Sequence, residues 1–255
     1  MKSYPNVKIN LGLHVLRKRP DGFHDLETLF VPCDAFHDTL EIEAADEFDI
    51  HIDNSDWDPQ SDLTAKAYRL LKADFPDLPP VRIRLHKGSP VGAGLGGGSA
   101  DCAFALRMMN GLFSLGLSDD ALAAYAARLG SDCAFFVYNR PMFARGRGEI
   151  LEPFDLDLSG YDIRVAIPEG VHVSTREAYA GVTPRYAVQT DEGSLHSILA
   201  QPIEAWRDTL VNDFEPSVFK AHPEIEELKR TMYEDGAVYA AMSGSGSAVF
   251  GLFRK

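Results

Sequence analysis

The sequence predicts an α+β protein with two domains. Runs expected to form strands are mixed with expected helices, without the regular strand–helix alternation of a parallel α/β sheet. The chain has 255 residues, a length at which one domain often becomes two. The polar, turn-like segment 155–160 gives the candidate boundary, so the expected domains are residues 1–154 and 155–255.

Strands are expected in the first part of the chain wherever apolar residues alternate between turn residues. These runs are Val7–Val15, Leu26–Pro32, Asp38–Ala44, Glu47–Ile52 and Val81–His86, of which the three from Leu26 to Ile52 are expected to be antiparallel. Asp62 is the predicted N-cap of a helix over Leu63–Phe75, which Pro79 and Pro80 stop.

Helices are more frequent after residue 100. Ala103, Leu106 and Leu112 form one apolar helical face, and Ser118 begins a second helix that reaches Leu129. The remaining expected elements are a hairpin over Met142–Pro153, a strand over Tyr161–Ile167, helices over Thr175–Ala180, Glu192–Leu199, Ile203–Leu210 and Glu224–Asp235, and strands over Val238–Met242 and Ala248–Phe253.

Charge and composition exclude several classes of protein. The net charge of −13 leaves no basic footprint for a nucleic acid, so a phosphorylated ligand must be attracted by local amides, a few cations and Mg²⁺. No apolar run reaches the length of a membrane span, and the start of the chain does not resemble a signal peptide. Three dispersed cysteines indicate neither a disulfide framework nor a zinc site. We therefore expect a cytoplasmic protein with a small-molecule partner, without nucleic acid or membrane.

A glycine-rich loop between Pro90 and Asp101 is the strongest local signal. Five of the seven residues from Gly92 to Gly98 are glycine, and an amphipathic helix follows directly. Backbone N–H groups of such a loop can converge on an anion, helped by the positive end of the helix dipole. The loop lacks the Gly-Lys-Ser/Thr of a Walker loop and the acidic strand end of a dinucleotide site. It predicts another kind of phosphate-binding loop.

Three further features carry chemistry only in combination. Lys8 is a charged residue in an apolar strand, which alone is typical of a solvent-facing edge lysine. Asp132 follows a helix end, where an ordinary cap is the simpler interpretation. The segment Ser243–Ser247 joins two strands through two glycines, which indicates close approach to a ligand or to another backbone.

Together these residues resemble the GHMP kinase superfamily over the span from Val7 to Phe253. The resemblance implies an N-terminal domain of the ribosomal protein S5 domain 2-like type, a ferredoxin-like C-terminal domain, and ATP and Mg²⁺ as cofactors. The Arg-Pro-Asp-Gly-Phe-His segment from Arg19 to His24 is similar to one branch, whose substrate is a cytidyl diphosphate of a sugar alcohol. Kinases of the mevalonate or homoserine type, and a catalytically silent nucleotide sensor, are the alternatives.

The resemblance also implies roles for individual residues. Asp132 would accept the proton of the acceptor hydroxyl, and Lys8 would offset charge on the moving phosphoryl group. The ATP phosphates would be bound by Pro90, Gly92, Gly94, Leu95, Gly96, Gly97, Gly98 and Ser99, the substrate by Asn10, Phe23, His24 and Tyr179, and the loop would be supported by Ser243, Gly244, Ser245 and Gly246.

The sequence departs from the family pattern at several positions. Ala100 replaces a second serine at the end of the loop, and Cys133 and Ala134 replace a common Val-Pro pair. Phe23 replaces a frequent tyrosine, and one extra residue precedes Lys8. These changes remove no expected catalytic group. The oligomeric state expected is a monomer or a homodimer.

Overall fold

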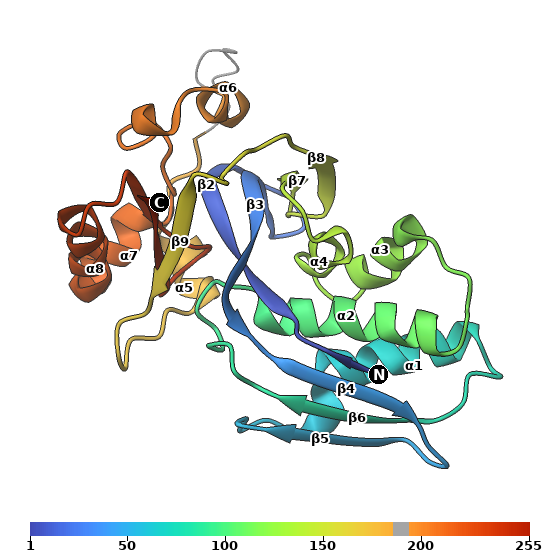
Figure 1. Ribbon diagram of the computed structural model, residues 1–255. Helices are drawn as coiled ribbons and strands as arrows, with labels where there is room; N and C mark the ends of the chain where they lie inside the picture. The colour runs from blue at the N-terminus through green and yellow to red at the C-terminus, as the bar shows by residue number, and fades with distance from the viewer. Residues whose placement is uncertain (186–193) are drawn as a thin grey trace. The chain divides into compact units, whose positions relative to one another are not determined.

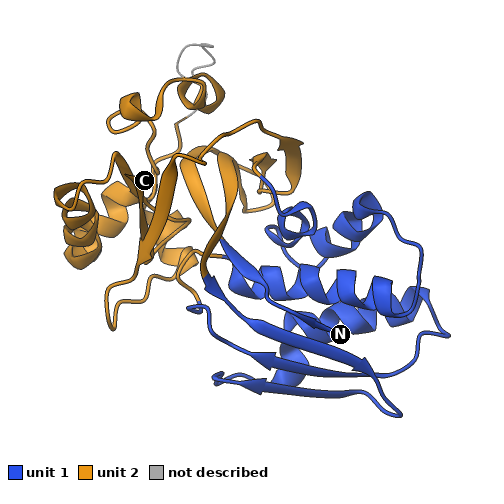
Figure 2. Cartoon of the chain, in the orientation of Figure 1, with its two compact units in different colours: residues 1–7, 36–91, 96–140 blue, residues 8–35, 92–95, 141–255 orange. Residues whose placement is uncertain are grey.

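The computed structural model describes residues 1–185 and 194–255 (Figure 1). The chain divides into two compact units that alternate along the sequence (Figure 2). Unit 1 comprises residues 1–7, 36–91 and 96–140, and unit 2 comprises residues 8–35, 92–95 and 141–255. These bounds differ from a single division after residue 154, and the domain boundary proposed from the sequence stays a prediction.

Unit 1 is a four-stranded sheet with helices on one face (Figure 1). The strand order is β1 (Lys2–Ser3), β4 (Thr39–Ala44), β6 (Val81–His86) and β5 (Asp49–Asp53). The helices are α1 (Leu63–Asp74), α2 (Gly97–Leu112), α3 (Asp119–Ala127) and α4 (Cys133–Tyr138), with a short 3₁₀ turn at Pro59–Ser61. Buried side chains of the sheet, among them Leu40, Ile42 and Ile83, form the core of this unit.

Local signals for these helices are confirmed. The Asp62 carboxylate accepts from the Thr64 N–H at 2.8 Å at the start of α1, and the Ser118 hydroxyl accepts from the Ala121 N–H at 3.2 Å at the start of α3. The expected antiparallel pairing is wrong for β5, which pairs with β6 in parallel. The chain between the two strands contains α1, and a crossover of this length permits parallel pairing.

Unit 2 contains two further sheets. The first has the strand order β2 (Asn6–Lys18), β3 (His24–His37), β7 (Met142–Gly146) and β8 (Ile150–Pro153). The second is antiparallel and has the strand order β10 (Tyr239–Met242), β11 (Val249–Arg254) and β9 (Tyr161–Ala166). Its helices are α5 (Thr175–Gly181), α6 (Leu195–Leu199), α7 (Glu215–Ala221) and α8 (Pro223–Glu234). An apolar cluster that includes Val15, Phe214 and Ile225 joins β2, α7 and α8.

Two expectations for this region need correction. The helix expected over 203–210 is only a 3₁₀ turn at Ile203–Ala205, because the buried Trp206 indole donates to the Gln201 carbonyl at 3.1 Å and fixes a tight turn. Helix α7 was missed from the sequence, although Glu215 and Pro216 are typical of a first helical turn; its N-cap residue, Phe214, makes no side-chain capping bond. The expected start of α6 at Glu192 lies outside the described residues. Among the residues described, no helix is long and apolar enough to cross a membrane.

Candidate functional site

The glycine loop approaches the Ser243–Ser247 turn very closely within unit 2. Gly94 has φ of +79°, and a Cβ atom placed on it would lie 2.1 Å from the Ser243 carbonyl oxygen. A Cβ on Gly244 would lie 3.1 Å from the Gly94 oxygen. Side chains at either position would separate the two turns. The close approach expected from the glycines of the second turn is thus confirmed, with the loop backbone as the partner.

Lys8 is buried and directed at the same loop. Its side chain is 3% exposed, and its Nζ donates to the Gly94 carbonyl at 2.8 Å and to Asn10 Oδ1 at 2.6 Å. The Lys8 backbone N–H donates to the Leu95 carbonyl at 2.9 Å. A lysine on an edge strand would extend into solvent, so the simpler interpretation of Lys8 does not hold. A buried ammonium group needs such polar partners to offset the loss of water.

Asn10 and Ser243 complete a hydrogen-bonded group around Gly94. Asn10 Nδ2 donates to Thr28 Oγ1 at 2.9 Å, and Thr28 donates in turn to the Gly12 carbonyl at 2.6 Å. The Ser243 hydroxyl donates to the Gly94 carbonyl at 3.0 Å. Lys8, Asn10, Gly94 and Ser243 are therefore brought together in unit 2, although the sequence analysis assigned Ser243 to a different domain from the other three.

Asn212 supports this group and was missed from the sequence. Its Nδ2 donates to the Met242 and Gly244 carbonyls, both at 2.8 Å, and its Oδ1 accepts from the Phe214 N–H. The side chain is 2% exposed. Ser245 extends away from these contacts, and its hydroxyl lies 3.1 Å from that of Thr175. The partners of Thr28 and the two carbonyl partners of Asn212 lie far along the chain, so these contacts have no local sequence signal, whereas the contact of Asn212 with Phe214 is local.

The other end of the loop begins α2 in unit 1. Gly96 is the N-cap residue with φ of +74°, and a glycine offers no side chain to the N–H groups of the first turn, where Gly97 and Gly98 lie. These N–H groups and the helix dipole favour an anion at this end. Gly92, at the start of the loop, has φ of +71°, and a Cβ there would lie 2.7 Å from the His172 ring. Pro90 leads into the loop, and Leu95 is buried.

Asp132 lies in a turn that packs against Ser99 within unit 1. A Cβ on Gly130 would lie 2.9 Å from Cys133 Sγ and 4.0 Å from Ser99 Oγ, so the turn and the start of α2 are adjacent. Asp132 occupies the N-cap position of α4, yet among the described residues its side chain makes no capping hydrogen bond to that helix. The turn that carries Asp132 is therefore adjacent to the start of α2, and the catalytic role of Asp132 stays a prediction.

His24 and Tyr179 form an aromatic pair in unit 2. Their rings stack with centroids 4.8 Å apart and an interplanar angle of 20°, and Tyr179 also meets Phe214 edge-on at 4.8 Å. Burial, followed by the nearby Lys18 charge, lowers the pKa of His24. The ring is therefore neutral at pH 7, with one nitrogen able to donate and the other able to accept.

Phe23 lies in an exposed turn fixed by ion pairs. Its ring is 54% exposed and has the Arg147 guanidinium 5.0 Å from its centroid. Arg19 bonds to Asp21 and Asp25, and Asp21 accepts from the Phe23 N–H at 3.1 Å. An exposed aromatic ring on a rigid turn is available for stacking. In the structure the Tyr179 ring thus stacks on the His24 ring, and the Phe23 ring contacts the Arg147 guanidinium.

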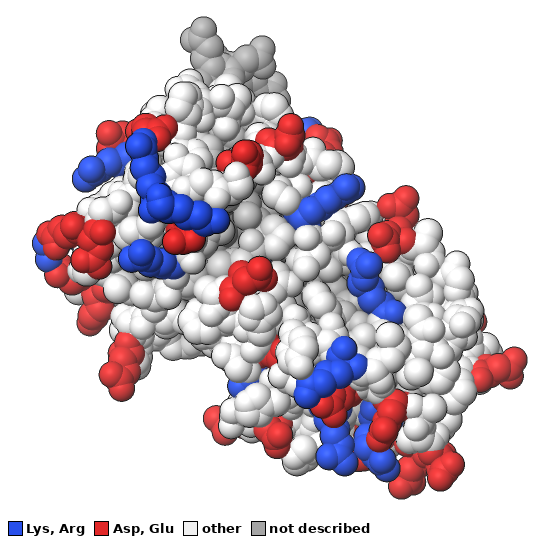
Figure 3. Space-filling model, viewed as in Figure 1, with Lys and Arg blue, Asp and Glu red and all other residues white. Residues whose placement is uncertain are grey.

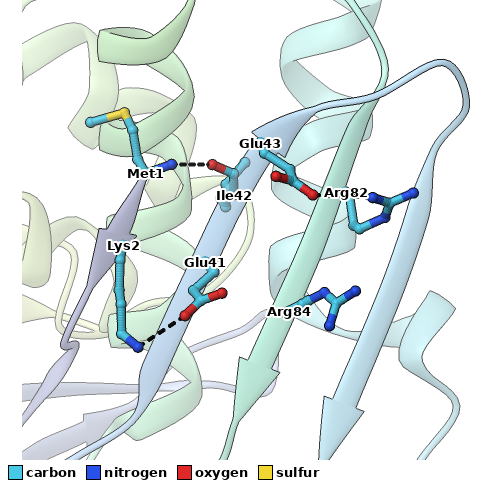
Figure 4. A pocket seen from close by; sticks show the side chains of 7 residues that line it. All are labelled: Met1, Lys2, Glu41, Ile42, Glu43, Arg82 and Arg84. Carbon is cyan, nitrogen blue, oxygen red and sulfur yellow. Dashed lines mark hydrogen bonds and ion pairs between the residues drawn. The ribbon is translucent and has the colours of Figure 1, made fainter.

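A separate hollow of about 420 Å³ lies on the open side of the unit 1 sheet (Figure 4). Its charged side chains bond to one another: Lys2 to Glu41 at 2.9 Å and Arg82 to Glu43 at 3.1 Å. The terminal amine of Met1 donates to the Ile42 carbonyl at 2.6 Å. These pairings are those of a solvated sheet face.

Comparisons with known proteins show the family to which the chain belongs. The family model described as the GHMP kinases N terminal domain matches residues 62–140, and that described as GHMP kinases C terminal matches residues 194–255. The chain belongs to the GHMP kinase family, as its resemblance predicted, and it has the α+β fold expected for that family.

Named relatives show which members of this family the chain is similar to over nearly its whole length. A protein of Bacteroides fragilis named 4-diphosphocytidyl-2-C-methyl-D-erythritol kinase is 49% identical, covering 99% of this chain and 92% of the relative. A protein of the same name from Cytophaga hutchinsonii is also 49% identical, with 99% and 92% covered. A solved structure titled 4-(cytidine 5'-diphospho)-2C-methyl-D-erythritol kinase has a TM-score of 0.83 at 34% identity, covering 99% of this chain and 90% of its own. A homoserine kinase structure from Cytophaga hutchinsonii, at 17% identity and a TM-score of 0.73 (98% and 85% covered), shares the fold.

Proposed function

We propose that this chain is an ATP-dependent kinase that phosphorylates the 2-hydroxyl of 4-diphosphocytidyl-2-C-methyl-D-erythritol, a step in non-mevalonate isoprenoid precursor synthesis. The observation that carries the proposal is the 49% identity to kinases of that name over 99% of the chain. The segment from Arg19 to His24, which is similar to the cytidyl-specific branch, supports it against a mevalonate or homoserine kinase.

The phosphate loop binds the triphosphate of ATP through backbone N–H groups. The residues proposed are Pro90, Gly92, Gly94, Leu95, Gly96, Gly97, Gly98 and Ser99. On the face seen in Figure 3, Lys and Arg side chains lie among Asp and Glu side chains instead of in one basic patch. Because the chain carries a net charge of −13, attraction of an anion depends on local dipoles, and the first turn of α2 supplies them.

Mg²⁺ fits the oxygen donors beside the loop. Within the described part of the chain no three His, Cys, Asp or Glu residues form a metal cluster, which suits an ion held mainly by substrate phosphates and water. The Ser99 hydroxyl, in the first turn of α2, would be a protein ligand of the ion. When bound, the ion neutralises charge on the phosphate oxygens.

The acceptor hydroxyl loses its proton to Asp132. As the oxygen of the alcohol bonds to the γ-phosphorus, the bond from that phosphorus to ADP breaks, and the carboxylate accepts the hydroxyl proton. Lys8 offsets negative charge on the transferred group and fixes Gly94 through its hydrogen bond. Asn10 hydrogen-bonds the substrate, and the turn from Ser243 to Gly246 supports the loop.

The cytidyl group is bound by the aromatic residues. The neutral His24 ring reads the edge of cytosine, and Phe23 and Tyr179 stack on the base. Each aromatic contact of this kind contributes about 1–3 kcal/mol. A catalytically silent sensor would need neither Lys8 nor Asp132, so the presence of both together with these aromatic residues argues against a sensor.

The proposal is tested by ADP release from Mg-ATP with three acceptors: 4-diphosphocytidyl-2-C-methyl-D-erythritol, mevalonate and homoserine. Turnover only with the cytidyl substrate is expected. Turnover with another alcohol alone, or ATP binding without turnover on any of the three, would refute the proposal. The Asp132→Asn variant should lose at least about a hundredfold in kcat, the usual contribution of a general base, while it keeps its unfolding midpoint.

A further inference from the structure

A buried ion network in unit 1 joins three residues to which no role has been assigned so far. Lys87, Asp38 and Asp101 are 6%, 1% and 1% exposed. Lys87 Nζ donates to Asp101 Oδ2 at 2.6 Å and to Asp38 Oδ2. Charged groups this deeply buried are costly unless they are paired, so their retention calls for a reason other than stability alone.

The network joins the two chain segments that flank the phosphate loop. Lys87 follows the end of β6 and precedes the loop, whereas Asp101 lies in the first turns of α2, after the loop. Asp38 accepts from the N–H groups of Gly88 and Ser89 at 2.8 and 2.7 Å. The Ser89 hydroxyl also donates to Asp38, at 2.7 Å. The segment that enters the loop is therefore held at its backbone.

The first turn of α2 packs directly on the same group. A Cβ on Gly97 would lie 2.3 Å from Ser89 Oγ and 3.5 Å from Asp38 Oδ2. Gly97 is the first residue of α2, where the unbonded N–H groups begin. A shift of Asp38 or Ser89 would therefore move the helix end that carries these donors.

The charges of the network are balanced by Lys87. Burial opposes ionisation of Lys87, but the two carboxylates outweigh it and raise the pKa of the ammonium. Burial likewise opposes ionisation of Asp38, but Lys87 and the donors of Ser89 lower the pKa of that carboxyl. Burial dominates for Asp101 and raises its pKa, and within the described residues its Oδ1 has no hydrogen-bond partner. Loss of Lys87 would leave two acids buried without a counter-charge.

We propose that Lys87, Asp38 and Asp101 are positioning residues for ATP: they fix the start of α2 and the entry to the loop so that the backbone donors face the phosphates. The proposal rests on the proposed function, because it assigns the loop to ATP. The three side chains act through Gly97 and Ser89 and need no contact with the acceptor alcohol. Their removal should weaken ATP binding selectively.

The test measures two affinities and one local readout. The variants are Lys87→Met and Asp101→Asn. The second keeps the shape of the side chain and removes its charge. The ligands are Mg-bound AMP-PNP and 4-diphosphocytidyl-2-C-methyl-D-erythritol, titrated by calorimetry. We expect Lys87→Met to weaken AMP-PNP binding about tenfold or more, the change expected when one backbone N–H no longer donates to a charged phosphate oxygen. Affinity for the cytidyl ligand should change less than about twofold.

Asp62→Ala is the matched control, because it removes a partly buried cap from the neighbouring α1. It should lower the melting temperature and leave both affinities unchanged. Hydrogen exchange of the ligand-free protein should accelerate at residues 100–103 in Asp101→Asn and at the start of α1 in Asp62→Ala.

The outcomes separate the two proposals. Unchanged AMP-PNP affinity in folded Lys87→Met, or equal weakening of both ligands, would overturn the positioning role. If Lys87→Met does not fold, Asp101→Asn decides: unchanged exchange at residues 100–103 would overturn the role, and local acceleration would support it. A wild-type protein that binds neither ligand would refute the proposed function, while the exchange result would still decide whether the network holds α2.

Discussion

Replacing Gly94 with alanine should disrupt both the stability of the chain and its binding of ATP. The backbone at Gly94 has φ of +79°, a conformation that costs a residue with a Cβ atom about 1–2 kcal/mol. The added methyl group would lie 2.1 Å from the Ser243 oxygen and 3.2 Å from the Gly246 oxygen, so one of the two turns must move. Overpacking of this kind costs about 1–3 kcal/mol more. We therefore expect Gly94→Ala to lower the free energy of unfolding by about 2–5 kcal/mol.

Urea unfolding of Gly94→Ala and Gly236→Ala separates the two contributions. Gly236 has φ of +96°, and a methyl group there would meet no described atom within 4 Å. Gly236→Ala should therefore cost only about 1–2 kcal/mol. Movement of Gly94 also disturbs its carbonyl, which accepts from Lys8 and Ser243, so the ATP KM should rise in Gly94→Ala alone. Equal destabilisation of the two variants, with unchanged ATP KM, would refute the reasoning.

Further predictions concern pH, substrate binding and the supporting loop. Burial, with the Arg185 charge, lowers the pKa of His14 to about 4, against about 6.5 in the unfolded chain, which therefore binds the extra proton as the pH falls. His14 should lower the free energy of unfolding by up to about 3 kcal/mol as the pH falls from 6.5 to 4, and should have no effect at higher pH. If the free energies of unfolding of His14→Leu and of the wild type fell in parallel over this pH range, the prediction would be contradicted. His24→Ala should raise the KM for the cytidyl substrate about tenfold, and an equal rise for ATP would argue against base recognition. Asn212→Ala leaves two buried carbonyls unpaired and should cost about 2–4 kcal/mol in urea unfolding, whereas a cost below about 0.5 kcal/mol would show that Asn212 does not support the loop.

Elements with strong local signals could be predicted from the sequence, whereas their pairing could not. The caps at Asp62 and Ser118 are determined by bonds to residues two or three positions away, and both occur as expected. The parallel direction of β5 depends on which strand it meets after the chain has folded through α1, and its own residues carry no such information. The helix expected at Ile203 ends early because the tertiary environment of Trp206 overrides local propensity.

In the candidate site, too, features with local sequence signals could be predicted, whereas contacts between distant residues could not. The glycine loop and a functional role for Lys8 could be predicted because several motifs resemble one family in the same order, whereas the burial of Lys8 is seen only in the structure. The contacts of Thr28, and those of Asn212 with the Met242 and Gly244 carbonyls, could not be predicted, since these partners lie 16 to 32 positions away. Lys87 directly precedes the loop and offered a usable signal, because a cation there is adjacent to a predicted phosphate site. Its two aspartate partners become evident only in the folded chain.

The central claim is phosphoryl transfer to a specific hydroxyl of the cytidyl substrate, and ³¹P NMR of the reaction mixture tests it most directly. Wild-type protein with Mg-ATP and 4-diphosphocytidyl-2-C-methyl-D-erythritol should give ADP and one new phosphomonoester in equal amounts, with the ester on the 2-hydroxyl. ADP without a new phosphomonoester, an ester at another hydroxyl, or no reaction would contradict the account.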